Sequence, residues 1–186
     1  MKITVYGASS SALSERHVAQ GRRMGQLIAE RGWTAVNGGG SAGIMGAVTD
    51  GALDAGGRVT GIIPMFMVDR GLLYDRLTDV VVAADMAQRK QLLADGAAAI
   101  IVMAGGIGTY DEFFEAITLR QLQLIDSEVV VVNVDGYFDP MIAMLQRAAD
   151  EHLMRGNSFD ELFTLVPDAD AAIAYLNKKL KPREGR

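Results

Sequence analysis

The sequence predicts an α/β protein with a doubly wound, mostly parallel sheet of the Rossmann-like type and helices on both faces. Short apolar segments alternate with longer helical patterns along the chain, which is the order that βαβ units produce. Several strand segments, such as 99–103 and 128–134, are apolar on both faces, as parallel strands buried between two helical layers are. At 186 residues, without a linker or an internal repeat, the chain is expected to form one domain over residues 1–186.

The elements of the first half follow from their local patterns. A strand at 2–6 ends in a small-residue turn that opens a helix over 14–31, and a strand at 33–37 ends in a glycine-rich turn whose helix ends near 56. A third strand (58–63) ends at Pro64. The segment from there to residue 74 has no clear period, so we expect a loop at a pocket edge. A fourth strand (79–83) precedes a helix over 85–96.

The second half repeats this alternation. The apolar strand 99–103 leads through a glycine turn into a helix over 110–124, and the strand 128–134 leads into a helix over 139–154. A strand (163–166) and a helix (168–180) follow, and residues 177–186 are expected to be a frayed polar tail. Because the strands run parallel, the turns after residues 6, 37, 83 and 103 should meet in one crevice at the carboxyl edge of the sheet.

The composition narrows the possible chemistry. The chain is 49% hydrophobic and 22% charged with a net charge of -5, which is ordinary for a globular protein and argues against a nucleic-acid polymer as partner. It has no cysteine and two histidines, so thiolate or histidine metal centres and a Ser-His-Asp triad are not expected. We expect no metal, no cofactor and no membrane partner. Because neither a signal peptide nor a spanning segment is evident, we also expect a cytoplasmic protein.

A glycine turn follows the apolar strand at 99–103. It contains Gly105, Gly106, Gly108 and Thr109 and precedes a helical pattern. The first N–H groups of a helix have no intrahelical partner and lie at the positive end of its dipole, so they favour an anion. Glycine also lets a phosphate approach the backbone. The turn is therefore either an anion site or a tight connection alone.

Two adjacent cations, Arg89 and Lys90, stand in an unusual place. Asp85 and Gln88 fit a capping box, which puts both cations in the opening turns of a helix, where the dipole disfavours positive charge. They are either solvated, with Arg89 pairing with Asp85 four residues before it, or they face an anion at the neighbouring strand end.

Glu112 also has two interpretations. Thr109 and Glu112 fit a capping box, in which the glutamate folds back on the Thr109 N–H. An anion at the glycine turn would compete for that N–H and leave Glu112 facing the crevice, with Glu115 one turn further on the same face. By spacing, Asp111 is expected to point elsewhere.

The turn after residue 37 holds further candidates. The turn carries neither the dinucleotide fingerprint nor the P-loop fingerprint, so its motif does not decide the role of its glycines. Gly40 and Gly43 allow either close packing of helix and strand or backbone contact with a ligand. Ser9 and Ser41 are either helix caps or hydroxyl donors to a nucleotide. Met86 is either core filler or a flexible contact for a flat base.

These residues together resemble the LONELY GUY family, cytokinin riboside 5′-monophosphate phosphoribohydrolases long labelled lysine decarboxylases. The resemblance extends from about residue 3 to beyond residue 170 and is carried by 38–46, Gly61-Ile62-Ile63-Pro64, Asp85-Met86 with Arg89-Lys90, 105–109 with Glu112, and Asn133-Val134-Asp135-Gly136-Tyr137. The family signature is Pro-Gly-Gly-x-Gly-Thr-x-x-Glu, and Ala104 replaces its proline, which we expect to alter the rigidity of the turn. Leu119-Arg120 stands where many relatives carry Trp-Ala, at a position expected to touch the base or a dimer contact.

The resemblance implies hydrolysis of the N-glycosidic bond of AMP or N6-substituted AMP, giving the free base and ribose 5-phosphate, by a homodimer. It implies that Glu112 orients water or stabilises the sugar cation and that Arg89 positions the ribose phosphate or helps the departing base. The implied substrate-binding residues are Ser9, Gly40, Ser41, Gly43, Met86, Lys90, Gly105, Gly106, Gly108, Thr109 and Glu115. Two alternatives remain, a non-catalytic nucleotide-binding protein of this fold and a pyridoxal-phosphate lysine decarboxylase, for which Lys90 is the sole lysine away from the chain ends.

Overall fold

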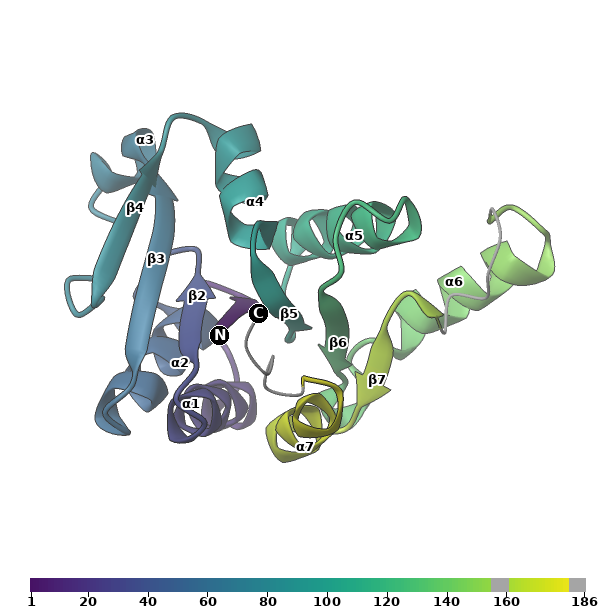
Figure 1. Cartoon of the computed structure of the whole chain (residues 1–186), viewed down its shortest axis with the longest axis horizontal. Coiled ribbons are helices and arrows are strands. Elements are labelled where there is room, and N and C mark those ends of the chain that lie inside the picture. Colours follow the sequence, from purple (N-terminus) through teal and green to yellow (C-terminus); the bar gives the residue numbers. More distant parts are fainter. Residues whose placement is uncertain (155–160, 181–186) are drawn as a thin grey trace, which may run out of the picture.

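The computed structural model describes residues 1–154 and 161–180, which form one sheet between two layers of helices (Figure 1). The strands are β1 (Lys2–Tyr6), β2 (Thr34–Asn37), β3 (Arg58–Pro64), β4 (Asp79–Ala83), β5 (Ala97–Val102), β6 (Glu128–Val132) and β7 (Thr164–Val166). The helices are α1 (Glu15–Glu30), α2 (Gly43–Asp54), α3 (Met65–Val68), α4 (Met86–Ala94), α5 (Ile107–Gln121), the 3-10 turn η1 (Val134–Gly136), α6 (Asp139–Asp150) and α7 (Ala169–Lys179).

The sheet is doubly wound. Its seven strands lie in the order β4-β3-β2-β1-β5-β6-β7, and each neighbouring pair is parallel. The chain first adds strands on one side of β1 and then crosses back to add β5, β6 and β7 on the other. The predicted fold class is confirmed, and the winding direction changes between β1 and β5.

The two helical layers enclose separate cores. Helices α1, α2 and α7 pack on one face of the sheet with Ile101, whereas α4, α5 and α6 pack on the other face with Ile100 (Figure 1). These neighbouring strand residues point to opposite faces, and both are fully buried. The central strand β5 is apolar at every position, with the sequence AAAIIV, because both of its faces are covered.

Several element boundaries differ from the sequence prediction. Helix α5 begins at Ile107, three residues earlier than expected, and α6 ends at Asp150 rather than at residue 154. The segment 64–74 contains the short helix α3. Helix α7 continues to Lys179, so residues 177–179 are helical where a frayed tail was expected. The end of that tail, 181–186, lies outside the described residues. Within the described part of the chain, no helix has the length and apolar character needed to cross a membrane.

Candidate functional site

The turns after β1 and β5 meet the start of α2 at the carboxyl edge of the sheet. The N–H of Ala8 donates to the Ala104 carbonyl at 3.0 Å, and the N–H of Ile44 donates to the Ala8 carbonyl at 2.8 Å. The loop after β1 therefore connects both glycine turns. Strands β1 and β5 flank the change in winding direction, where doubly wound sheets bind ligands.

Arg89 is buried at this edge, neither solvated nor paired with Asp85. Asp85 caps α4 with its side chain, as predicted. The Arg89 guanidinium donates to the Ile62 carbonyl at 3.1 Å, to the Gly38 carbonyl at 3.5 Å and to the Glu112 carboxylate at 3.4 Å. A Cβ on Gly38 would lie 2.1 Å from Arg89 Nη2. The guanidinium therefore occupies the space that glycine leaves at this position.

Glu112 lies in the second turn of α5 with a side chain that is 12% exposed. Burial raises the pKa of Glu112 to about 7, although the positive charges of Arg89 and Lys90 oppose the shift. Asp111 and Glu115 add to the shift by charge repulsion. At neutral pH the carboxyl is therefore close to its midpoint of ionisation and can both accept and donate a proton.

Lys90 lies between two carboxylates of α5. Its Nζ is 3.2 Å from an oxygen of Asp111 and 3.2 Å from an oxygen of Glu115. Burial lowers the pKa of Lys90, but hydrogen bonds with both carboxylates raise it overall. Asp111 thus faces Lys90, and the expectation that it points elsewhere is wrong. No group of three or more His, Cys, Asp or Glu side chains in the described ranges is arranged to hold a metal ion.

The N-terminus of α5 carries no side-chain cap. Gly106 is the N-cap residue and Ile107 is the first helical residue. Thr109 is therefore the third residue of the helix and cannot be its N-cap, so the capping box with Glu112 is wrong. The first backbone N–H groups of α5 have no intrahelical partner, and they lie at the positive end of the helix dipole.

The glycine turn divides into a packed part and an open part. Gly105 is buried, and a Cβ at this position would lie 2.0 Å from Thr109 Oγ1. Thr109 itself is 4% exposed. Gly106 and Gly108 are exposed, and a Cβ on either would meet nothing within 4 Å. The turn is firmly seated on the protein while its exposed glycines leave space for an anion.

The remaining predicted residues have different surroundings. Gly43 has a φ of +64°, and a Cβ there would lie 2.5 Å from a backbone carbonyl of the loop after β1, so close packing explains this glycine. Gly40 is half-buried, and a Cβ there would make an ordinary contact with the Met45 side chain at 3.4 Å, whereas Ser9 and Ser41 are exposed in their loops. Met86 is 41% exposed in the first turn of α4, where it is available as a surface contact instead of filling the core.

Three residues that sequence reasoning missed take part in this edge. Tyr6 ends β1 and is 4% exposed, and burial together with two nearby glutamates raises its pKa. Asn37 accepts the Gly39 N–H through Oδ1 at 2.9 Å and so shapes the second glycine turn. The Tyr137 hydroxyl donates to the Gly105 carbonyl at 2.5 Å. A usable signal existed for Tyr6 and Asn37, since each is the last residue of its strand, whereas Tyr137 is separated from β6 by the turn η1.

Comparison with known proteins identifies the family. Residues 45–176 match the family model described as "Possible lysine decarboxylase". The chain is 36% identical over 174 residues to a cytokinin riboside 5′-monophosphate phosphoribohydrolase of Mycobacterium tuberculosis, with 92% of each chain covered. It is 35% identical over 177 residues to an Arabidopsis thaliana protein of the same description, with 95% of this chain and 82% of the relative covered. The chain belongs to the LONELY GUY family.

Solved structures of the same fold include proteins that bind or carry the molybdenum cofactor. The molybdenum cofactor binding protein of Rippkaea orientalis superposes with a TM-score of 0.75 at 19% identity, with 97% of both chains covered. The molybdenum cofactor carrier protein of Chlamydomonas reinhardtii superposes with a TM-score of 0.72 at 22% identity, with 95% of this chain and 96% of that chain covered. At such identities the likeness concerns the fold of this LONELY GUY protein alone.

Two departures from the LONELY GUY pattern can now be located. Ala104, which replaces the signature proline, is 5% exposed and is held by its hydrogen bond from the loop after β1. Arg120 lies at the opposite end of α5 from the crevice, where it donates to the Ser127 carbonyl and pairs with Glu128 at 3.6 Å. Because Glu128 begins β6 at the amino edge of the sheet, this position lies away from the crevice of its own chain, and a contact with the base or with a second copy of the chain stays a prediction.

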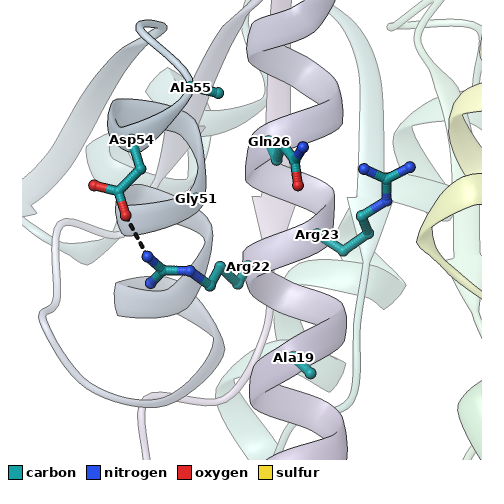
Figure 2. A pocket seen from close by; sticks show the side chains of 7 residues that line it. All are labelled: Ala19, Arg22, Arg23, Gln26, Gly51, Asp54 and Ala55. Carbon is teal, nitrogen blue, oxygen red and sulfur yellow. Dashed lines mark hydrogen bonds and ion pairs between the residues drawn. The ribbon is translucent and has the colours of Figure 1, made fainter.

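Two hollows lie away from the candidate site of this LONELY GUY protein. One, of about 340 Å³, lies between α1 and α2 and is bordered by Arg22, Arg23 and Asp54, with Arg22 paired to Asp54 (Figure 2). The other, of about 890 Å³, lies at the amino edge of the sheet beside Lys2 and Asp95. Neither is lined by a residue that the sequence predicts for the site.

Proposed function

We propose that this protein hydrolyses the N-glycosidic bond of AMP or of an N6-substituted AMP to the free base and ribose 5-phosphate. The observation that carries the proposal is the buried pair of Arg89 and Glu112, at 3.4 Å. Arg89 comes from α4 and Glu112 from the second turn of α5, close to a helix N-terminus with unpaired N–H groups. A phosphate at that N-terminus would bring the attached sugar toward the carboxylate.

The phosphate is assigned to the glycine turn. In the proposal the backbone N–H groups of Gly105, Gly106, Gly108 and Thr109 bind it, since helix N-termini and glycine turns favour anions. Ser9, Gly40 and Ser41 of the adjoining turns, together with Met86, complete the binding surface, and Gly43 supports it by letting the turns pack closely. Part of the binding energy of the phosphate then holds the sugar against Glu112, so nucleosides without a phosphate are expected to be poor substrates.

Glu112 carries the proposed chemistry. As the bond from C1′ to the base nitrogen breaks, its electron pair leaves with the base and the sugar becomes oxocarbenium-like. An ionised Glu112 stabilises that positive charge, or it accepts a proton from the water that attacks C1′. The base gains a proton as it departs. A pKa of about 7 lets Glu112 perform either role at neutral pH.

Three other charged residues have supporting roles in the proposal. Arg89 positions the ribose phosphate or helps the departing base, and its buried carbonyl partners hold it beside Glu112. Glu115 holds the ribose hydroxyls. Lys90 adds positive charge near the phosphate, although the free protein balances that charge with Asp111 and Glu115.

Incubation with AMP and with isopentenyladenosine monophosphate tests the proposal. Chromatography should detect free base and ribose 5-phosphate, and adenosine should react far more slowly than AMP. Binding of AMP without release of base would instead support a non-catalytic nucleotide-binding protein of this fold.

The family description also names lysine decarboxylation, and the residues here do not fit that chemistry. A pyridoxal-phosphate enzyme needs a lysine that forms a Schiff base, and a neutral amine is required for its attack. Away from the chain ends the sequence offers Lys90 alone. Two carboxylates hold Lys90 and raise its pKa, so they keep it charged and unreactive.

A homodimer in the cytoplasm is part of the proposal, and exposed valines on the edge strand β4 support the dimer. Val80, Val81 and Val82 are 42%, 38% and 45% exposed. Successive strand residues point to opposite faces, so neither face of this apolar strand is fully covered within one chain. We assign a second copy of the chain to this edge, since exposed apolar strands are otherwise prone to aggregate.

A further inference from the structure

The turn between β6 and α6 has an unusual backbone that presents Tyr137. The side chain of Asn133 accepts the Phe138 N–H at 2.7 Å. Asp135 and Gly136 take positive φ values of 56° and 72°, which cost conformational energy at a non-glycine residue such as Asp135. The segment Asn133-Val134-Asp135-Gly136-Tyr137 carried part of the family resemblance, and the proposed reaction gives it no role.

Tyr137 reaches from this turn to the glycine turn of α5. Its hydroxyl donates to the Gly105 carbonyl at 2.5 Å, across 32 residues of sequence. The ring is held edge to face by His17, with centroids 5.8 Å apart, and by Phe138, with centroids 4.9 Å apart. The side chain is therefore fixed by aromatic contacts on its ring and by a hydrogen bond at its tip.

This hydrogen bond sets the direction of one peptide group. In a trans peptide the carbonyl of Gly105 and the N–H of Gly106 point in opposite directions, and the described chain has no cis peptide bonds. A hydroxyl that holds the carbonyl therefore turns the Gly106 N–H away from Tyr137. Gly106 is the exposed N-cap of α5, so that N–H is available to an anion.

The glycine turn needs such a restraint. Two successive glycines, Gly105 and Gly106, have more backbone freedom than other residues, and Ala104 does not have the fixed φ of the proline in the family signature. The Ala104 carbonyl is held by the Ala8 N–H at 3.0 Å. The Tyr137 hydroxyl holds the next carbonyl, and the two bonds together fix consecutive peptides.

We propose that Tyr137 is a positioning residue that holds the phosphate-binding turn of α5 in its binding conformation. The proposal rests on the proposed function for the identity of the anion, a nucleotide 5′-phosphate. The Tyr137 O–H is already donated to Gly105, so it acts through the backbone and not on the substrate. Loss of the hydroxyl frees the peptide to rotate. The affinity for ligands that carry a phosphate then falls, whereas the affinity for ligands without a phosphate is unchanged.

Tyr137→Phe tests this role, with Tyr175→Phe as the matched control. Tyr175 also loses a hydroxyl hydrogen bond, at 2.9 Å to Glu128 at the amino edge of the sheet. In Tyr137→Phe we expect the Kd for ribose 5-phosphate, measured by calorimetry, and the KM for AMP to rise about three- to tenfold, the worth of one hydrogen bond. The kcat for AMP and the weak reaction with adenosine should change little, and Tyr175→Phe should match the wild type in all four.

The outcomes separate this inference from the proposed function. Release of base by the wild type reports on the function. The ratio of the ribose 5-phosphate Kd of Tyr137→Phe to that of the wild type reports on Tyr137. A ratio near one overturns the inference even if the enzyme is active, and so does a lower Tm in Tyr137→Phe with unchanged affinity, since that pattern describes a structural role. Failure of the wild type to bind ribose 5-phosphate at all also overturns it.

Discussion

The guanidinium of Arg89 and the carboxylate of Glu112 lie 3.4 Å apart, with side chains that are 9% and 12% exposed. They come from the facing helices α4 and α5. Their surroundings differ, because Arg89 has two further carbonyl partners whereas burial raises the pKa of Glu112 to about 7. The Glu112 carboxyl changes its protonation state near neutral pH, which is the property that a proton-transferring group needs.

Replacing Glu112 by glutamine should abolish hydrolysis while AMP still binds. Glutamine keeps the size of the side chain but can neither accept a proton nor balance a sugar cation, so we expect turnover to fall by at least about 100-fold. Release of free base and calorimetric binding of AMP measure the two effects. Glu151→Gln, at the exposed end of α6, is the control. If Glu112→Gln turns over at the wild-type rate, the carboxylate has no catalytic role.

Arg89→Ala should lower both turnover and stability. The substitution leaves the carbonyls of Ile62 and Gly38 and the buried Glu112 without their partner, which costs on the order of 3 kcal/mol of unfolding free energy. Urea unfolding and base release measure the two effects. Arg22→Ala removes an exposed pair with Asp54 and should cost less than about 1 kcal/mol. Equal effects of the two substitutions would contradict a special role for Arg89.

The raised pKa of Glu112 should make stability fall as the pH rises. Its pKa moves from 4.5 to about 7 on folding, so between these values the folded protein binds a proton that the unfolded chain has released. The Glu112 contribution is therefore lost progressively from pH 4.5 to pH 7, by on the order of 3 kcal/mol in total. Urea unfolding at several pH values should show a steeper decline for the wild type than for Glu112→Gln, and equal slopes would contradict the shift.

Much of this architecture could be predicted from local sequence, because the determinants are local. The alternation of apolar strands with helices predicted the parallel sheet. The unfavourable position of Arg89 near a helix N-terminus indicated a negatively charged partner outside its own helix. The start of α5 could not be predicted in the same way. The pattern of Thr109 and Glu112 is a valid cap locally, but the chain instead leaves Gly106 as an uncapped N-terminus.

The contacts that sequence reasoning missed join distant segments. Lys90 and Asp111 lie on different helices, and their pairing depends on how α4 and α5 pack. Tyr137 reaches Gly105 because β5 and β6 are neighbours in the sheet. The exposure of β4 likewise depends on its place at the sheet edge. Its sequence, with three successive valines, is typical of a buried strand, yet Val81 is exposed. Local periodicity contains none of this information.

Val81→Glu should convert the proposed homodimer into a monomer. The glutamate would place a charge on an exposed face of β4, and burying an unpaired charge against a second copy costs several kcal/mol. Light scattering coupled to size exclusion measures the mass. Val18→Glu is the control, because Val18 on α1 is similarly exposed at 37%. A wild type that is monomeric, or a Val81→Glu dimer as stable as the wild type, would contradict this assignment.

Gly38→Ala should damage the site through Arg89. The new Cβ would lie 2.1 Å from Arg89 Nη2, so the guanidinium must move away from the Gly38 carbonyl and from Glu112, or the turn must shift. We expect overpacking to cost about 1–3 kcal/mol of unfolding free energy and turnover to fall. A double-mutant cycle with Arg89→Ala tests whether Gly38→Ala acts through Arg89, because the effects of substituting two residues in contact do not add. If the effect passes through the guanidinium, the double variant turns over no more slowly than Arg89→Ala alone. Additive losses would mean that Gly38 acts on the glycine turn independently of Arg89.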